Sequence, residues 1–313
     1  MPQPPSSSQY VTRFAPSPTG ELHLGHVAHA AWVWGVVASL DARVILRIED
    51  HDRGRCRPEY EKRILEDLKW LGLPLDPESL SSLEAGPSPF RQQDSEAYYQ
   101  RALEALADQG LVYGCTCSRA MIAEEVGDGI VSGQEQRYPG RCRDRGVSLG
   151  AGVGIRVRFP DEVVTFKDRL LGHQSQTPAK QCGDLLIRDR NGNWTYQFCA
   201  TVDDLRHGVT LVVRGDDLLS STGRQILPAR LLGREDPSSF LHHPLVYNRE
   251  GVKLSKRDRS VALGELRAAG RTPAEVLGMS LSASGVIDAI RPVDVVELGE
   301  LLLEMLPDGH LSE

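Results

Sequence analysis

Residues 13–32, RFAPSPTGELHLGHVAHAAW, carry two histidines three positions apart, His23 and His26, where an apolar helix begins. A metal site, a structural turn and an anion site are the three possible interpretations. Glycines around the turn, Gly20 and Gly25, let a ligand approach the backbone closely, and the first N–H groups of a helix attract negative charge. Two imidazoles beside a phosphate could stabilise charge that develops in phosphoryl or nucleotidyl transfer. The pattern favours an anion site.

A second candidate for phosphate chemistry is the run GVKLSKR at residues 251–257, which contains Lys253 and Lys256. Lysine ammonium groups are point charges that suit a polyphosphate, whereas a run of this kind can also be an ordinary solvated loop. Lys253 lies 230 positions after His23. The two runs together are far more specific than either alone, and they indicate a nucleotide site.

The overall composition excludes several classes of protein. A net charge of −7 argues against a protein that coats RNA or DNA non-specifically, although it permits a local basic surface. The longest apolar run, residues 28–40, is too short for a bilayer, and residues 1–9 do not resemble a signal peptide. Six cysteines in 313 residues do not suggest a secreted disulfide framework. We therefore expect a cytoplasmic protein without membrane contact, with a disordered tail at residues 1–9. As a separate expectation, we take it to be a monomer.

Alternating strand and helix patterns position the two runs. Residues 11–16 and 42–50 read as strands, and the second is a continuous apolar run, as in a buried parallel strand. Helical spacing follows at 25–40, 58–71 and 95–110. This order predicts an α/β fold with a doubly wound parallel sheet, whose carboxyl edge collects the chemistry. Strand and helix signals return between residues 191 and 232, and the last fifty residues are helical.

Three cysteines lie in a region of different character, residues 113–190, which we interpret as an insertion. Cys115 and Cys117 stand one residue apart, and Cys142 follows 25 residues after Cys117. Three thiolates supply soft ligands for a tetrahedral zinc, and spacing alone leaves the fourth ligand open. The candidates near Cys142 are Tyr138, Glu135 and Asp144.

The runs HLGH and KLSKR together resemble the two ATP signatures of class I aminoacyl-tRNA synthetases. The longer run RFAPSPTGELHLGH is similar to the glutamyl branch of that class, as are RIEDHD, TVDD, VVRGDDLLSSTGRQ and HHPLVYNREGVKLSKR. The resemblance covers residues 11–257. It implies a class I Rossmann-like catalytic domain that uses ATP with magnesium to activate L-glutamate. The lysine run has leucine where the general pattern has methionine, and arginine in place of its final serine.

The resemblance also implies roles for individual residues. The glutamate-binding positions are Arg13, Phe14, Ala15, Pro16, Ser17, Glu49, Tyr196 and Arg214; those for ATP are His23, Gly25, His26 and Lys256; the catalytic ones are His23, His26, Lys253 and Lys256. Without the resemblance, Arg214 could simply pair with Asp216 or Asp217, and Tyr196 could be a core residue. Arg13 and Arg214 could also exchange the substrate carboxylates that they bind.

The cysteine pattern C-x-C followed by Y-x₃-C resembles the zinc site of glutamyl-queuosine tRNA(Asp) synthetases, truncated relatives of glutamyl-tRNA synthetase. This resemblance implies one structural zinc bound by Cys115, Cys117, Tyr138 and Cys142. It also implies transfer of glutamate to queuosine at the wobble position of tRNA(Asp), with the anticodon stem-loop as partner. Only 57 residues follow Lys256, too few for a typical further domain that would read the anticodon of tRNA(Glu).

We accordingly divide the chain into the tail at 1–9, a first half of the catalytic domain at 10–112, an inserted zinc-binding subdomain at 113–190, a second half of the catalytic domain at 191–245, and a lysine loop with a helical region at 246–313. No anticodon-binding domain is expected. The rival functions are a glutamyl-tRNA synthetase that charges the 3′ end of tRNA(Glu), a small-molecule nucleotidyltransferase, and a non-catalytic synthetase-like RNA-binding module.

Overall fold

The computed structural model describes residues 10–40, 42–127, 136–246 and 261–307. Its strands are β1 (Tyr10–Phe14), β2 (Ala42–Leu46), β3 (Val112–Cys115), β4 (Gly154–Val157), β5 (Val164–Asp168), β6 (Gly172–Gln176), β7 (Leu185–Arg188), β8 (Leu211–Gly215) and β9 (Ser239–His243). Its α-helices are α1 (Leu24–Ala38), α2 (Pro58–Trp70), α3 (Pro77–Ala85), α4 (Glu96–Asp108), α5 (Arg119–Val126), α6 (Pro178–Gln181), α7 (Tyr196–Arg206), α8 (Gly223–Leu231), α9 (Leu263–Ala268), α10 (Pro273–Ala283) and α11 (Leu298–Leu303). Short 3-10 helices cover Gln92–Asp94, Asp216–Ser221 and Val295–Glu297.

Parallel strands form the centre of the molecule, as the sequence predicts. β1 pairs with β2, and β8 pairs with β9, both in parallel. Val11 and Thr210 join these two pairs, because the N–H of Val11 donates to Thr210 Oγ1 and the N–H of Thr210 donates to the carbonyl of Val11. β5 continues the row beside β9, and β6 pairs with β5 in antiparallel fashion. The carboxyl ends of β1, β2, β8 and β9 therefore meet at one edge.

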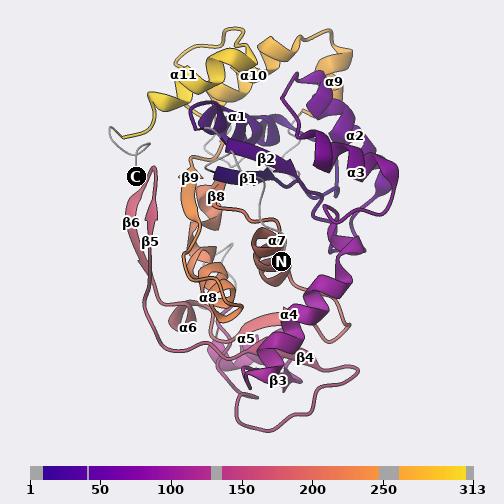
Figure 1. The fold of residues 1–313 in the computed structure, drawn as a ribbon, viewed down its shortest axis with the longest axis vertical. Helices are drawn as coiled ribbons and strands as arrows, with labels where there is room; N and C mark the ends of the chain where they lie inside the picture. The colour runs from indigo at the N-terminus through magenta and orange to yellow at the C-terminus, as the bar shows by residue number, and fades with distance from the viewer. Residues whose placement is uncertain (1–9, 41, 128–135, 247–260, 308–313) are drawn as a thin grey trace.

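Helix α1 is buried between the sheet and the C-terminal helices, which explains why its sequence is apolar on nearly all sides. Figure 1 shows α10 and α11 lying across the outer side of α1. At Gly35 an added Cβ would lie only 2.7 Å from the backbone carbonyl oxygen of Leu298 on α11, so this position requires glycine. The predicted helical C-terminal region thus packs on α1, which separates it from the sheet. Among the helices of the described ranges, none is both long and apolar enough to cross a bilayer.

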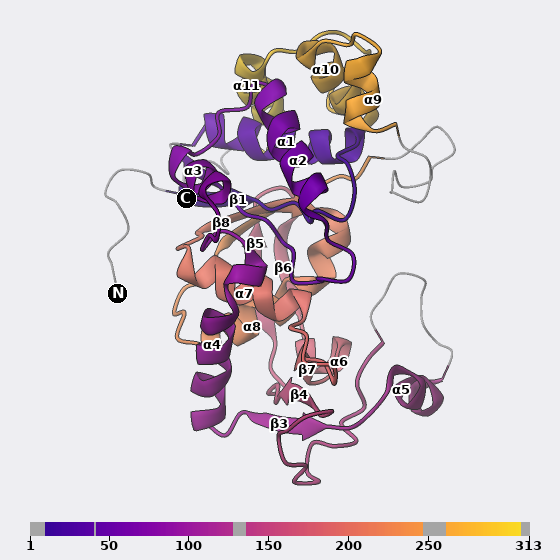
Figure 2. The same cartoon turned by 90° about the vertical axis from the view of Figure 1, so that its right-hand side faces the viewer.

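The region that contains the cysteines lies at the far end of the molecule from these helices. There β3, β4 and β7 form a small antiparallel sheet, and α5 lies at its outer side (Figure 2). The β5–β6 hairpin, although it belongs to the same stretch of sequence, extends the central sheet. The predicted insertion at residues 113–190 therefore contributes to both sheets.

Candidate active site and cysteine cluster

The two histidines of the first loop lie at the N-terminus of α1 and hold each other in place. Nδ1 of His23 accepts from the N–H of Gly25, and Nδ1 of His26 accepts from the N–H of His23, each at 3.1 Å. The ring centroids are 3.9 Å apart. Since both Nδ1 atoms accept backbone protons, each neutral ring carries its own proton on Nε2. The N-terminus of α1, the positive end of the helix dipole, therefore carries two Nε2–H donors, and both features favour binding of an anion.

Lys253 and Lys256 lie outside the described residues, but the chain on both sides of residues 247–260 contacts α1. At the end of β9, His243 Nε2 lies 2.9 Å from Nδ1 of His29, and its ring stacks on Trp32. After the gap, Ala262 forms an antiparallel bridge with His23. The described residues on each side of 247–260 therefore lie beside the histidine-bearing helix.

Four of the residues predicted to bind glutamate come together at the sheet edge. Arg13 lies near the end of β1, Glu49 follows β2, Tyr196 begins α7 and Arg214 lies near the end of β8. Burial raises the pKa of the Tyr196 hydroxyl to about 12, and the negative charge of Glu49 adds to this shift. The charges of Arg214 and Arg13 oppose it. All three ionic groups are thus close enough to act on one phenol.

A network of ion pairs holds Arg13 and Glu49, two of these four residues, in place. Arg13 Nε lies 3.2 Å from Oδ1 of Asp204 on α7, and Nη1 of the fully buried Arg47 lies 2.6 Å from the same oxygen. The other terminal nitrogen of Arg47 donates to Glu49 Oε1 at 2.8 Å. Arg13 and Glu49 are therefore fixed through shared partners, so the carboxylate of Glu49 and the guanidinium of Arg13 are preorganised before a ligand arrives.

The side chain of Arg214 is 3% exposed, and its hydrogen bonds go to neutral groups. Nε donates to Nε2 of His242 at 3.0 Å, Nη1 to Gln225 Oε1 at 2.5 Å and Nη2 to Thr222 Oγ1 at 2.8 Å. Burial lowers its pKa to about 10. An arginine has five N–H donors, so these bonds leave one N–H on each terminal nitrogen, a fork that fits a carboxylate. The alternative of a simple pair with Asp216 or Asp217 does not describe these contacts.

The remaining residues of the first loop contribute mainly backbone and packing. Phe14 is buried, and its ring packs against His29 and Trp34 in the main core. The carbonyl of Pro16 accepts from the N–H of Glu49, and the carbonyl of Ser17 accepts from the N–H of Thr19. Ala15 and Ser17 are half-buried. The side chain of Phe14 therefore belongs to the core, and the loop is fixed by its backbone.

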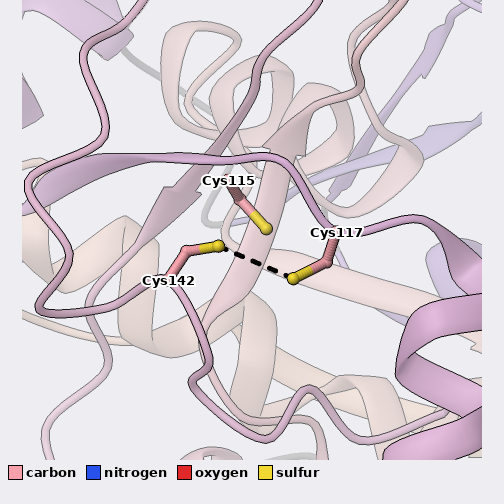
Figure 3. A group of neighbouring side chains, drawn as sticks. All are labelled: Cys115, Cys117 and Cys142. Carbon is pink, nitrogen blue, oxygen red and sulfur yellow. Dashed lines mark hydrogen bonds between the residues drawn. The ribbon is translucent and has the colours of Figure 1, made fainter.

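Cys115, Cys117 and Cys142 lie together in the small sheet region, with their sulfur atoms within 4.8 Å of one another (Figure 3). The sulfurs of Cys117 and Cys142 are 3.6 Å apart. A tetrahedral zinc with Zn–S distances of about 2.3 Å would separate two sulfurs by about 3.8 Å. The thiols therefore fit three positions of such a site. Among the histidine, cysteine and acidic side chains in the described part of the chain, these three cysteines are placed so that they could together hold a metal ion.

Tyr138 lies closer to the thiols than Asp144, one of the alternatives for the fourth position. The hydroxyl of Tyr138 is 3.4 Å from the sulfur of Cys115 and 3.9 Å from that of Cys117. The side chain of Asp144 is 88% exposed and pairs with Arg158 instead. Glu135 lies outside the described residues. The guanidinium of Arg156 stacks 3.6 Å above the tyrosine ring, and its Nε donates to the sulfur of Cys115, contacts that would favour negative charge on both side chains.

A cavity of about 650 Å³ connects the sheet edge that carries Tyr196 with the region of the cysteine cluster. Tyr196 and Gln197 line it at the sheet edge, and Arg156 and Asp184 line it on the side of the cysteines. Its wall carries charge of both signs, since Arg53 and Arg119 line it together with Asp52 and Asp189. The cavity is large enough for a nucleotide-sized group next to Tyr196.

Comparison with known proteins supports the sequence interpretation. The family model for the catalytic domain of class I tRNA synthetases (E and Q) matches residues 9–284. The glutamyl-Q tRNA(Asp) synthetase of Symbiobacterium thermophilum is 40% identical over 296 residues, which cover 91% of this chain and 90% of that protein. The chain belongs to the glutamyl-Q tRNA(Asp) synthetase family. It is therefore an enzyme of the ligase class.

Two further relatives place the chain within the larger class. The glutamate–tRNA ligase of Frankia casuarinae is 35% identical over 268 residues, which cover 86% of this chain but 54% of that protein. The crystal structure of a glutamate tRNA ligase from Elizabethkingia meningosepticum superposes with a TM-score of 0.74 at 25% identity, covering 93% of this chain and 64% of that one. The chain thus has the class I synthetase catalytic fold and spans about half to two thirds of these longer relatives.

Sequence reasoning missed several residues that organise the site. Arg47 and Asp204 form the network beneath Glu49, while His242 and Asp168 lie behind Arg214. Arg47 and Asp204 fall inside the quoted runs RIEDHD and TVDD, and His242 lies in HHPLVYNREGVKLSKR, so the signal was present. Asp168 gave no signal, because it comes from the predicted insertion and reaches the site only through strand pairing.

Proposed function

We propose that the protein activates L-glutamate with magnesium-bound ATP and transfers the glutamyl group to the queuosine of tRNA(Asp). The observation that carries the glutamate assignment is the meeting of Arg13, Glu49, Tyr196 and Arg214 at one sheet edge. The acceptor assignment rests on the relatives, since the similarity to the Symbiobacterium thermophilum protein named for this substrate extends over 90% of its length.

In the first step, an oxygen of the glutamate α-carboxylate attacks the α-phosphorus of ATP. The bond from this phosphorus to the bridging oxygen breaks, pyrophosphate leaves, and glutamyl-adenylate remains. Negative charge builds up on the phosphate oxygens in this step, and the Nε2–H groups of His23 and His26 are suited to stabilise it. Lys253 and Lys256 are assigned the same task, and Gly25 gives ATP access to the helix N-terminus.

In the second step, a hydroxyl of the queuosine cyclopentenediol attacks the activated carbonyl, loses its proton, and displaces AMP. This cis-diol resembles the diol of a terminal ribose, so the same acyl-transfer chemistry applies. We assign the queuosine nucleotide of the anticodon loop to the 650 Å³ cavity next to Tyr196. Arg137, Arg141 and Arg145 are exposed near the cysteine cluster and would contact the RNA backbone.

We assign one zinc to Cys115, Cys117, Tyr138 and Cys142. With four protein ligands the metal has no open position, so its role is structural. Bound zinc would hold the end of β3 against the loop that contains Tyr138 and Cys142. The protein is assigned as a cytoplasmic monomer.

The decisive experiment supplies labelled glutamate, ATP and total tRNA, and then locates the label on the RNA. Ribonuclease digestion separates the anticodon fragment of tRNA(Asp) from the 3′-terminal adenosine of tRNA(Glu). We expect label on the anticodon fragment, and none on tRNA(Asp) from cells that cannot make queuosine. Label on the 3′ adenosine would establish the rival function of charging tRNA(Glu). Absence of glutamate-dependent exchange of pyrophosphate into ATP would favour a non-catalytic module.

A further inference from the structure

Arg214 is held by a chain of buried groups that the activation chemistry itself does not use. Behind it lies His242, and behind His242 lies Asp168, both with no exposed surface. Nδ1 of His242 is 2.6 Å from Oδ2 of Asp168, and the Nε–H of Arg214 points to Nε2 of His242 at 3.0 Å. The three residues come from β8, β9 and β5, three adjacent strands.

The contacts of Asp168 determine which atom donates and which accepts in the hydrogen bonds that link Asp168, His242 and Arg214. Its Oδ1 accepts from the N–H groups of Leu170 and Leu171, at 3.0 and 2.9 Å. Its Oδ2 accepts from the N–H of His242 at 3.1 Å and faces the ring Nδ1. A carboxylate only accepts, so Nδ1 of His242 must donate, and a neutral ring then has an unprotonated Nε2.

The neutral form of His242 is the one that Arg214 requires. Burial lowers the pKa of His242, and the ring faces the positive charge of Arg214. Its Nε2 lies near two donors, the Nε–H of Arg214 and the hydroxyl of Thr222, which is 3.1 Å away. The same hydroxyl oxygen accepts from Nη2 of Arg214. If the proton moved to Nε2, both donors would lose their acceptor.

We infer that Asp168 and His242 are positioning residues for substrate selection: Asp168 sets the tautomer of His242, and His242 orients the Arg214 fork toward the side-chain carboxylate of the substrate. The inference rests on the proposed role of Arg214 in binding glutamate. It assigns the β5–β6 hairpin a part in amino-acid recognition, since β5 pairs with β9 through Asp168 and Phe240.

The test replaces Asp168 by asparagine and measures glutamate-dependent pyrophosphate exchange in the presence of total tRNA. The Oδ1 position accepts from two backbone N–H groups and the Oδ2 position from one, so the amide oxygen takes the Oδ1 position and the amide NH₂ faces Nδ1 of His242. The ring proton must then sit on Nε2, opposite the donor of Arg214, as in tautomer reversal by an aspartate-to-asparagine change. We expect the KM for glutamate to rise about 10- to 100-fold, the range for a hydrogen bond to a charged group. The KM for ATP and kcat should change by less than about threefold.

Two substitutions of His242 separate positioning from a structural effect. His242→Leu removes the acceptor and should reproduce the Asp168→Asn effect on the KM for glutamate. His242→Gln can place its Oε1 toward Arg214 and should retain a KM near that of the unaltered enzyme. In the double variant Asp168→Asn with His242→Gln, the KM should return toward that of His242→Gln alone, because a glutamine acceptor does not depend on a ring tautomer.

Asp67→Asn is the matched control, because Asp67 is a buried carboxylate on α2 that makes no contact with this chain of groups. Equal KM values for glutamate in Asp168→Asn and the unaltered enzyme would overturn the inference. The inference would also be overturned if kcat fell and the KM values for glutamate and for ATP rose by similar factors, because such a result would indicate general destabilisation. If Arg214→Gln also left the KM for glutamate unchanged, the proposed role of Arg214 itself would fail.

Discussion

Arg13 on β1 and Asp204 on α7 form a buried ion pair, with Arg13 Nε 3.2 Å from Oδ1 of Asp204. Arg47 binds the same carboxylate. Although burial alone would raise the pKa of Asp204, the two guanidinium groups lower it to about 2. The carboxylate of Asp204 therefore links β1 to α7 next to the residues that we propose bind glutamate.

The first prediction concerns the stability contributed by Asp204. Because its pKa is lower in the folded protein than in the unfolded chain, its contribution is present above about pH 4 and is lost as the pH falls through about 2. Asp204→Asn leaves two buried guanidinium groups without their shared carboxylate, so we expect a loss of about 3 kcal/mol in the free energy of unfolding at pH 7.

Urea unfolding at pH 7, 4 and 3 measures this effect. The difference between the unaltered protein and Asp204→Asn should shrink below pH 4. Asp144→Asn is the control, because the side chain of Asp144 is 88% exposed. A difference that stays constant across the three pH values would contradict the prediction.

The second prediction concerns His26. Glutamine at this third position of α1 can still accept from the N–H of residue 23, so His26→Gln retains the helix cap while it removes the imidazole. We expect pyrophosphate exchange to slow by about 10²–10³-fold, because a charge-stabilising donor is lost, with little change in the melting temperature. Unchanged exchange would rule out a role for the ring in activation.

The third prediction concerns the choice of amino acid. Glutamine has no anionic side chain and would leave the buried Arg214 fork without a carboxylate, so the unaltered enzyme should prefer glutamate over glutamine by at least about 100-fold in kcat/KM. Arg214→Gln should abolish most of this preference. Arg230→Gln serves as control, because Arg230 is exposed and pairs with Glu162. Equal activation of both amino acids by the unaltered enzyme would refute the assignment.

The fourth prediction concerns the metal. Elemental analysis of the purified protein should find about one zinc per chain, and less in Cys115→Ser. Tyr138→Phe should weaken zinc retention against a chelator, while the ring stays beneath Arg156. Cys56→Ser should behave like the unaltered protein, because Cys56 lies outside the cluster. A metal-free protein with full activity and an unchanged melting temperature would mean that the cysteines are incidental.

The sequence by itself determined the parallel α/β core and the positions of most elements. The helix expected at residues 25–40 is α1, Leu24–Ala38, and the one expected at 95–110 is α4, Glu96–Asp108. These predictions succeeded because apolar periodicity, proline and glycine act within a few residues. The ATP and glutamate runs could also be found, since each combines several residue types at fixed local spacing.

Only the tertiary structure decided which groups support these residues. Arg47 contacts Asp204 across 157 positions, and His242 contacts Asp168 across 74. No local pattern encodes such pairs, because they depend on which strands become neighbours and on how deeply each charge is buried. The bonding of Arg214 to neutral groups, rather than to Asp216 or Asp217 beside it in sequence, is likewise a consequence of the packing of β8 against β9 and α8. β8 ends at Gly215 and the chain enters a 3-10 helix at Asp216, so proximity in sequence does not predict the partner of a buried charge.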